Sequence, residues 1–499
     1  MVVVTAPRVV ETHSALVFLV GDRAYKVKKP VSLGFLDFST LERRWAVCHD
    51  EVLLNRRLAP DVYLGVHDLV GTDGVPYEHL VVMRRMPEDR SLSALLDAGA
   101  DVRDDLRQLA RLLAGFHATA RTSPGITATG SVESVRSLWD SGLQSLGDFV
   151  GPVLDAATYD ELVRLSGRYL DGRGPLFALR QAEGRIRDGH GDLLSADVFC
   201  LDDGPRVLDC IEFDPLLRYG DVLLDVAFLA MDLTDRGHPE LARAFLADYE
   251  EFSGQYQPAS LTRHYLAYRA QVRSKVTCLR WAQGDEAAPP AAQHLAALAL
   301  AELQGAAVRL VLVGGPPGVG TSTVAGGLAD RHGWALARSD VVRKQLAGLR
   351  PEDRAAAPLD TGLYAPGSTD RTYEELLAHA RTALSFGESV VLDASWSDPA
   401  RRAAARAVAE QTCSELVELV CSAPPEVVAE RTARRAAEGR DASDADPRTA
   451  ALLAGRFAPW PEAHVLDTTR PPDAVLEAAT ELVRIRPRGP QPTTRTEHA

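Results

Sequence analysis

The sequence is poor in lysine and cysteine, and it has no long uninterrupted hydrophobic run. No apolar stretch reaches the about 20 residues that a membrane-spanning helix needs, and the first residues lack the basic start and apolar core of a signal peptide. The 6 cysteines among 499 residues are scattered without the C-x-x-C spacing of metal or redox sites. We therefore expect reduced thiols, no membrane contact and a cytoplasmic location.

An excess of positive charge is also missing. The formal net charge is −14, which argues against a general nucleic-acid binder. Hydrophobic residues make up 46% and charged residues 25% of the chain, values typical of a globular protein. The length predicts two or three domains, each large enough to bury a core.

Lysine is so rare that its positions are informative. The chain has only five lysines, and three of them are Lys26, Lys28 and Lys29. Because arginine is the default basic residue here, this cluster indicates a site that requires a compact ammonium group rather than a planar guanidinium.

Acidic residues in the segment 187–233 have the order of a phosphotransferase catalytic segment. A turn carries His190-Gly191-Asp192, and Asp197 follows five residues later; an apolar strand then ends at Asp209. A kinase needs an aspartate near the acceptor hydroxyl, a side-chain oxygen for Mg²⁺ and a second aspartate that bridges metal and phosphates. Asp192, Asp197 and Asp209 can fill these roles in that order.

The segment resembles that of the aminoglycoside phosphotransferase-like kinases, whose pattern is H-G-D-[LI]-H-x-x-N, a strand ending in I-D, and G-D-x-x-x-D-[LV]-A. The chain matches the last part of this pattern with Gly220-Asp221 and Asp225. It departs at Leu194, which replaces a histidine, and at Asp197, which replaces the metal-binding asparagine. The resemblance implies a bilobal kinase fold that uses ATP and Mg²⁺.

The lysine cluster lies where such a kinase needs it. Alternation on both sides of Gly21-Asp22 predicts a β-hairpin, with Lys26 and Lys28 on one face of its second strand. A strand lysine that aligns the phosphates is held by a glutamate from the next helix. We prefer Lys26 over Lys28, and Glu51 over Glu42 as its partner.

The second half begins with a glycine-rich turn between a strand and a helix. A buried strand (308–313) precedes Gly315, Gly318 and Gly320, and a helix is predicted to start near Ser322. This arrangement is a Walker A context, in which backbone N–H groups cradle phosphate. Its candidate ATP-binding residues are the three glycines, Thr321, Ser322 and Thr323, with Ser322 also a metal ligand. Thr321 stands where the motif has lysine, and we expect Arg343 or a lid arginine, such as Arg435, to supply the missing charge.

Five strands predicted after residue 307 are separated by helices, which indicates a parallel sheet. Asp393 ends the third strand at a Walker B-like position and is a candidate metal ligand. This half resembles P-loop kinase-like ATPases of the zeta-toxin, polynucleotide kinase and 2-phosphoglycerate kinase kind. The resemblance implies that Asp340, after the second strand, acts as the base toward an acceptor, and that a lid closes over the phosphates with Arg431, Arg434, Arg435 and Arg440.

We thus predict a fusion with an α+β bilobal protein kinase-like domain (1–283), a linker and helix (284–306), an α/β P-loop NTPase domain with a five-stranded parallel sheet (307–486), and a disordered tail (487–499). Arg269, Arg273 and Lys275 are expected on a solvated helix face. The predicted function is ATP- and Mg²⁺-dependent phosphoryl transfer to a hydroxyl of a small molecule by the first domain, with a second or regulatory nucleotide site in the other. The alternative is a nucleotide-sensing or scaffold protein with degenerate sites, favoured by the departures at Leu194, Asp197 and Thr321.

Overall fold

A computed structural model of the chain describes residues 8–12, 14–32, 36–351, 353, 360–438 and 447–484. The predicted tail and Arg440 lie outside these ranges. The chain divides into two compact units, one made of Met1–Ser166, Phe177–Gln257 and Leu261–Gln304 and the other of Gly167–Leu176, Pro258–Ser260 and Gly305–Ala499. Among the described helices, none is long and apolar enough to cross a membrane.

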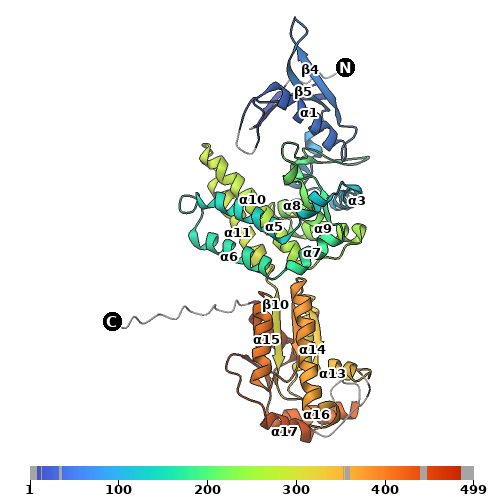
Figure 1. Cartoon of the computed structure of the whole chain (residues 1–499), viewed down its shortest axis with the longest axis vertical. Coiled ribbons are helices and arrows are strands. Elements are labelled where there is room, and N and C mark those ends of the chain that lie inside the picture. The colour runs from blue at the N-terminus through green and yellow to red at the C-terminus, as the bar shows by residue number, and fades with distance from the viewer. Residues whose placement is uncertain are drawn as a thin grey trace, which may run out of the picture. The chain divides into compact units, whose positions relative to one another are not determined.

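The first unit opens with a five-stranded sheet in the order β1-β2-β3-β5-β4, in which all pairs are antiparallel (Figure 1). The strands are β1 (Arg8–Glu11), β2 (Ala15–Val20), β3 (Arg23–Lys28), β4 (Tyr63–Val70) and β5 (Pro76–Arg84). The predicted hairpin around Gly21 is present as β2 and β3. Helix α1 (Leu41–Asn55) packs against this sheet, and its Cys48 and Val52 share a core cluster with Ala24 and Val81.

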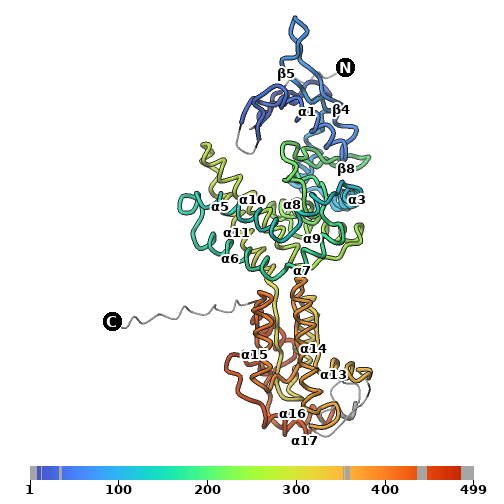
Figure 2. The backbone as a smooth tube through the Cα atoms, in the orientation of Figure 1, coloured from blue at the N-terminus to red at the C-terminus, as the bar shows by residue number. Residues whose placement is uncertain are grey.

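The rest of this unit is mainly helical (Figure 2), and two small β-ribbons carry the acidic segment. Strand β6 (Ile186–Asp188) pairs with β9 (Tyr219–Asp221), and β7 (Val198–Leu201) pairs with β8 (Gly204–Val207). The helices that lie wholly or mostly in this unit are α2 (Leu92–Asp97), α3 (Arg103–Thr119), α4 (Pro124–Ala128), α5 (Val132–Gly147), α6 (Ala156–Asp171), α7 (Gly174–Ala182), α8 (Val222–Asp235), α9 (Pro239–Ser253), α10 (Ala259–Ala282) and α11 (Pro289–Gly305). Helix α11 lies in the stretch predicted as a linker, and its Ala292 and Ala296 pack into a core cluster with Leu146.

The second unit contains a five-stranded parallel sheet in the order β11-β12-β10-β13-β14. Its strands are β10 (Arg309–Gly314), β11 (Ala335–Arg338), β12 (Val390–Asp393), β13 (Glu415–Ser422) and β14 (His464–Asp467). The helices are α12 (Thr321–His332), α13 (Ser339–Leu346), α14 (Pro366–Ser385), α15 (Pro399–Gln411), α16 (Pro425–Glu438), α17 (Pro447–Gly455) and α18 (Pro472–Arg484).

Helices cover both faces of this sheet, whose central strand β10 is apolar and buried from Leu310 to Val313. Val311 and Val313 belong to a core cluster that includes residues of α12 and α18. Leu310 and Leu312 are equally buried and, by strand alternation, face the other side, where α14 contacts β10. A strand buried on both faces is typical of a parallel α/β sheet.

The predicted fold class is confirmed: a kinase-like α+β domain precedes an α/β domain with a parallel five-stranded sheet. One expectation is wrong in part. Arg269 does not lie on a solvated face but is buried, where its Nε donates to the Leu224 carbonyl over 3.1 Å and its guanidinium stacks over the Phe228 ring. The surrounding helices α8 and α10 enclose this position, which helical periodicity alone does not reveal.

Candidate functional site

The first unit brings the predicted lysine, helix glutamate and strand-end aspartate together. Lys26 Nζ donates to Asp209 Oδ1 over 2.8 Å and lies 2.9 Å from Glu51 Oε1. Burial would lower the pKa of Lys26, but Asp209 and Glu51 raise it well above its ordinary value. The ammonium is therefore permanently charged and is held between the sheet, helix α1 and the acidic segment.

Lys28 occupies the next position on the same face of β3 and makes a second, more deeply buried set of ion pairs. Its Nζ is 2.6 Å from Glu51 Oε2 and 2.5 Å from Glu212 Oε1. Only 1% of the Lys28 side chain is exposed, against 14% for Lys26. Lys26 is thus the cation that remains accessible, whereas Lys28 anchors Glu51. The sequence analysis missed Glu212, although its position three residues after Asp209 was a usable signal.

The three aspartates differ in their electrostatic environment. Lys26 lowers the pKa of Asp209 to about 2, so this carboxylate is ionised at any physiological pH. Burial raises the pKa of Asp192 to about 6, while the nearby Arg273 opposes the shift. Burial, together with Asp209 and Asp192, raises the pKa of Asp197 well above its ordinary value. A neighbouring negative charge disfavours ionisation of a carboxyl group, which is why Asp209 raises the pKa of both Asp192 and Asp197.

These residues fit a Mg²⁺ ion. Carboxylate oxygens are the hard ligands that Mg²⁺ takes, and in kinases one or two of them act together with phosphate and water oxygens. Among the described residues, no group of three or more His, Cys, Asp or Glu side chains forms a complete metal cluster. Asp197 and Asp209 would hold the ion, with the nucleotide completing its shell. Asp209 also has a left-handed backbone, with φ 61°, a strained conformation that concentrates at functional sites.

The turn that carries Asp192 is held by Asp225, the last acid of the family pattern. The backbone N–H groups of His190 and Gly191 donate to Asp225 over 2.7 and 2.8 Å, and His117 Nε2 lies 3.1 Å from the same carboxylate. Burial opposes ionisation, but the partners of Asp225 hold its pKa below the usual range. Asp225 is therefore a structural anchor for the turn that carries Asp192.

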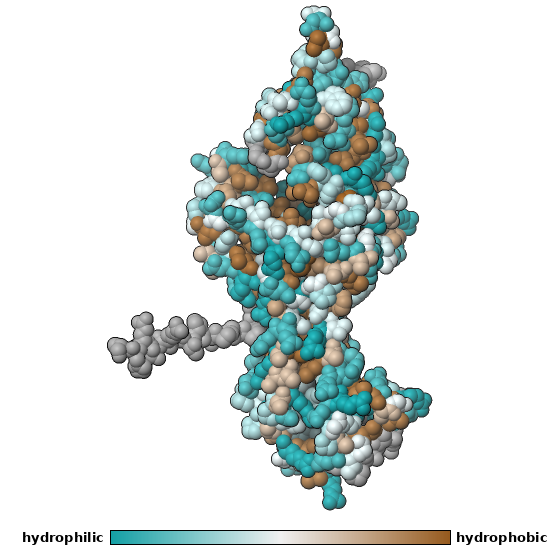
Figure 3. Space-filling model, viewed as in Figure 1, coloured by the Kyte–Doolittle hydropathy of each residue, from teal (hydrophilic) through white to brown (hydrophobic). Residues whose placement is uncertain are grey.

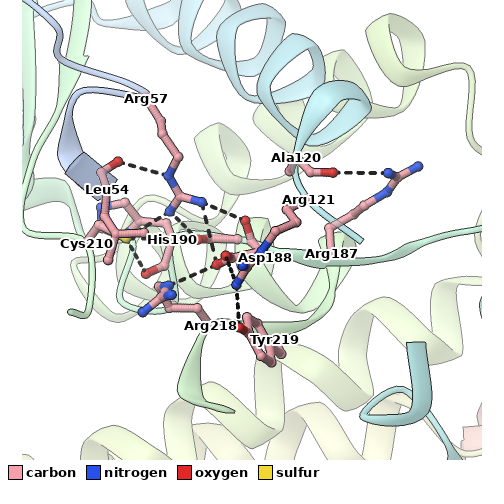
Figure 4. Close-up of polar contacts among 12 residues, drawn as sticks. Leu54, Arg57, Ala120, Arg121, Arg187, Asp188, His190, Cys210, Arg218 and Tyr219 are labelled. Atoms are coloured by element: carbon pink, nitrogen blue, oxygen red, sulfur yellow. Dashed lines mark hydrogen bonds and ion pairs between the residues drawn. The ribbon is translucent and has the colours of Figure 1, made fainter. Parts of the chain in front are cut away.

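An arginine network holds the other side of this turn (Figure 4). Arg57, just beyond the end of α1, donates to the carbonyls of Asp188 and Gly189 over 3.0 and 2.8 Å. Arg218 Nε donates to Asp188 Oδ1 over 2.9 Å, and Arg121 lies 3.3 Å from Asp188 Oδ2. The helix that carries Glu51 is thus tied to the turn that carries Asp192, a link that the sequence analysis missed.

Two hollows lie in this unit near the site. The visible face is hollowed where the sheet meets the helical part, with hydrophobic residues along part of its border (Figure 3). A cavity of about 1030 Å³ lies beside α1 and α3 and is lined by Glu212 and the arginine network. Lys26, Asp192 and Asp209 are not among its lining residues, so we assign the chemistry to the charge cluster and not to this cavity.

In the second unit, the glycine-rich turn joins β10 to α12. Gly318 and Gly320 have left-handed backbones, with φ of 91° and 98°, and a Cβ at Gly318 would lie 2.6 Å from Thr432. Glycine is thus required at this position by both conformation and space. Gly320 precedes Thr321 at the start of α12, so Thr321, Ser322 and Thr323 form the first turn of a helix whose free N–H groups can bind phosphate.

Ser322 and Asp393 meet at the carboxyl end of the sheet. Ser322 Oγ donates to Asp393 Oδ2 over 2.6 Å, and burial raises the pKa of Asp393, opposed by Ser322 and Arg338. This hydroxyl–carboxylate pair fits the oxygen set that P-loop proteins offer to Mg²⁺.

Asp340 and Arg343 line a cavity of about 350 Å³, and Gly315, Thr321 and Ser322 of the glycine-rich turn line the same cavity. Arg343 Nη1 donates to Asp340 Oδ1 over 2.7 Å. The Arg343 guanidinium also stacks over the Tyr364 ring at 4.8 Å. Arg343 is therefore hydrogen-bonded to Asp340, the predicted base.

The predicted lid arginines are only partly described. Arg431 donates to the hydroxyl and carbonyl oxygens of Thr468 over 3.2 and 2.7 Å, and Arg434 is exposed. Arg435 belongs to α16, but its side chain lies outside the described part of the chain. Its role and those of the other candidate site residues stay predictions.

The fold and the two charged sites together define a class: a kinase-like domain followed by a P-loop domain. A family model described as "AAA domain" matches residues 310–460, in agreement with the expected P-loop half. The chain is 42% identical over 475 residues to the uncharacterized protein Rv2004c of Mycobacterium tuberculosis and to the uncharacterized protein Mb2027c of Mycobacterium bovis, with 95% of each chain covered. The chain belongs to the family of these mycobacterial proteins.

Several solved structures are similar to one part of the chain. A choline/ethanolamine kinase family protein from Mesorhizobium loti is 14% identical, covers 60% of this chain and 92% of its own, and has a TM-score of 0.38. Aminoglycoside 2'-phosphotransferase-IIIa is 16% identical, with 60% and 93% covered and a TM-score of 0.37. A sugar kinase from Janibacter is 22% identical, with 36% and 95% covered and a TM-score of 0.27.

Proposed function

We propose that the protein is an ATP- and Mg²⁺-dependent phosphotransferase whose first unit transfers the γ-phosphoryl group to a hydroxyl of a small molecule. The observation that carries this proposal is the position of Lys26 between Glu51 and Asp209, at 2.9 and 2.8 Å. A lysine held by a helix glutamate beside a metal-binding aspartate is the arrangement that aligns nucleotide phosphates in kinases.

Asp192 is the catalytic residue in this proposal. It orients the acceptor hydroxyl and accepts its proton as the oxygen attacks the γ-phosphorus, while the bond from that phosphorus to the β-phosphate oxygen breaks and ADP leaves. A pKa of about 6 makes Asp192 a better proton acceptor than an ordinary aspartate while it stays ionised at neutral pH. Mg²⁺ bound by Asp197 and Asp209 would neutralise charge on the phosphates.

The second unit is proposed to hold a second nucleotide site at the P-loop, with Ser322 and Asp393 as the metal pair and Asp340 as the base if this site transfers phosphate. Asp340 pairs with Arg343 in the cavity beside the P-loop. The site is active or regulatory according to whether an acceptor enters that cavity.

The test is ADP release from the full chain with Mg²⁺–ATP and a panel of sugars, amino alcohols and hydroxy acids. Asp192→Asn should abolish acceptor-dependent ADP release while ATP affinity stays nearly unchanged, because Asp192 does not contact the nucleotide in the proposed arrangement. Asp203→Asn is the matched control, since Asp203 is an exposed acid of the same segment paired with Arg206.

Acceptor-dependent turnover that survives Asp192→Asn would overturn the assignment. Nucleotide binding without transfer to any acceptor would favour the alternative, a nucleotide-sensing protein with degenerate sites. The departures at Leu194 and Asp197 support that alternative.

A further inference from the structure

The P-loop of the second unit lacks the lysine that normally neutralises the β- and γ-phosphates. Thr321 stands at that position, at the first residue of α12. A polyphosphate in a helix N-terminus still needs a nearby cation for tight binding. Four arginines line the cavity beside the P-loop: Arg338, Arg343, Arg401 and Arg456.

Three of these arginines are paired with acids that are not part of the phosphate-binding turn. Arg343 is bound to Asp340 over 2.7 Å. Arg401 is bound to Asp370 over 3.0 Å, and Arg456 is bound to Asp360 over 3.0 Å.

Arg338 differs because it contacts the P-loop itself. Its Nη2 donates to Ser322 Oγ over 3.0 Å, and its Nε donates to Asp393 Oδ2 over 3.2 Å. The guanidinium therefore binds the two side chains that would hold Mg²⁺. One of them, Ser322, directly follows Thr321, the position at which the lysine is missing.

The sheet fixes Arg338 in this place. Arg338 is the last residue of β11 and lies in register with Asp393, the last residue of β12. Carboxyl ends of parallel strands form the ligand-binding edge of an α/β sheet. The base of the Arg338 side chain is thus anchored, while its long stem lets the guanidinium turn within the cavity.

We propose that Arg338 supplies the positive charge that a lysine supplies in other P-loops, and that without nucleotide its guanidinium stands in for the divalent cation between Ser322 and Asp393. With a nucleoside triphosphate and its metal bound, Arg338 releases these two side chains and pairs with the phosphates. The inference rests on the proposed nucleotide site of the second unit and deepens it.

The first experiment is isothermal titration of the full chain with ATPγS in Mg²⁺, in a Lys26→Met background that weakens the other site. Arg338→Gln should weaken binding at the P-loop about 10- to 100-fold, the loss expected for a charged hydrogen bond. Arg338→Lys and the double variant Arg338→Gln/Thr321→Lys should each restore most of that affinity, because they return a cation to the phosphates. Arg331→Gln, on the exposed side of α12 and paired with Glu477, should change nothing.

The second experiment measures Mn²⁺ binding to the nucleotide-free chain by electron paramagnetic resonance. Arg338→Gln should bind Mn²⁺ more tightly than the parent because Ser322 and Asp393 lose their cationic partner. A purely structural role for Arg338 predicts the opposite, since loss of its bonds would loosen the pair.

Unchanged ATPγS affinity in Arg338→Gln would overturn the proposal, as would failure of both cation-restoring variants when their thermal unfolding matches that of the parent. Loss of affinity in Arg431→Gln but not in Arg338→Gln would instead assign the cation to Arg431, which comes within 3.8 Å of a Cβ built at Gly320. Failure of the proposed second nucleotide site is seen separately, as the absence of ATPγS binding at the P-loop when Arg338 is intact in the Lys26→Met background.

Discussion

The two charged sites pair their acids with different cations. In the first unit, Lys26 reaches across from a β-strand to a helix glutamate and a strand-end aspartate. In the second unit, Arg338 reaches from the end of one strand to the end of the next. A lysine ammonium is a compact charge, whereas an arginine guanidinium can bridge two oxygen groups at once. The comparison teaches that a missing motif residue does not mean a missing charge.

Of the variants that test this comparison, we expect the largest loss of activity when Lys26 loses its charge. Lys26→Met should lower acceptor-dependent ADP release about 100-fold or more, because it leaves Glu51 and Asp209 without their shared partner at a site where one buried charge pair contributes several kcal/mol. Steady-state kinetics of the full chain provide the measurement. Lys29→Met is the matched control, because Lys29 pairs with Glu11 at the surface; an equal loss in both variants would contradict the assignment.

Asp225→Asn tests whether the first site depends on its anchored turn. An asparagine amide has only one oxygen, so it cannot accept both backbone N–H groups and also pair with His117. We therefore expect the free energy of unfolding to fall by about 3 kcal/mol and the protein to unfold at a lower urea concentration. The midpoint of urea unfolding, followed by circular dichroism, measures this loss. Asp235→Asn, at the end of the same helix and facing His294, should cost less; equal stability of Asp225→Asn and the parent would show that the turn does not need this anchor.

The pH dependence of turnover sharpens the difference between the aspartates. Asp192 must be ionised to accept a proton, and its pKa is raised to about 6. Therefore kcat/KM should fall about tenfold per pH unit below pH 6 and level off above it. Because Arg273 holds that pKa down, Arg273→Ala should move the acidic limb to higher pH. Arg263, which lies on α10 like Arg273 and pairs with Glu302 of α11, provides the control, and Arg263→Ala should leave the limb in place. An unmoved limb in Arg273→Ala would show that Asp192 is not the group that titrates.

The smallest expected effect is that of restoring the P-loop lysine alone. With Arg338 present, Thr321→Lys should change ATP affinity and hydrolysis by less than about threefold, because one cation already serves the phosphates. Nucleotide titration and ADP release under the same conditions measure both quantities. A large rise in hydrolysis would mean that the second site is crippled by Thr321 and that Arg338 does not compensate.

The sequence by itself determined the elements that depend on local pattern. Strand alternation predicted the hairpin that carries Lys26, and the apolar runs after residue 307 predicted a parallel sheet. The order of Asp192, Asp197 and Asp209 in the sequence predicted the acids of the first site, because turns and strand ends follow from short-range composition. The glycine spacing likewise placed Ser322 at a helix start.

Only the tertiary structure decided which charged groups meet. Glu212 and Arg57 join the first site through contacts with residues more than 130 positions away, and no short-range pattern encodes such pairs. Arg338 lies 55 residues before Asp393, and their meeting depends on β11 and β12 becoming neighbours in the sheet. Burial is likewise decided only when the helices pack together. Burial raises the pKa of Asp192, and Arg269 is buried although helical periodicity predicts a solvated position.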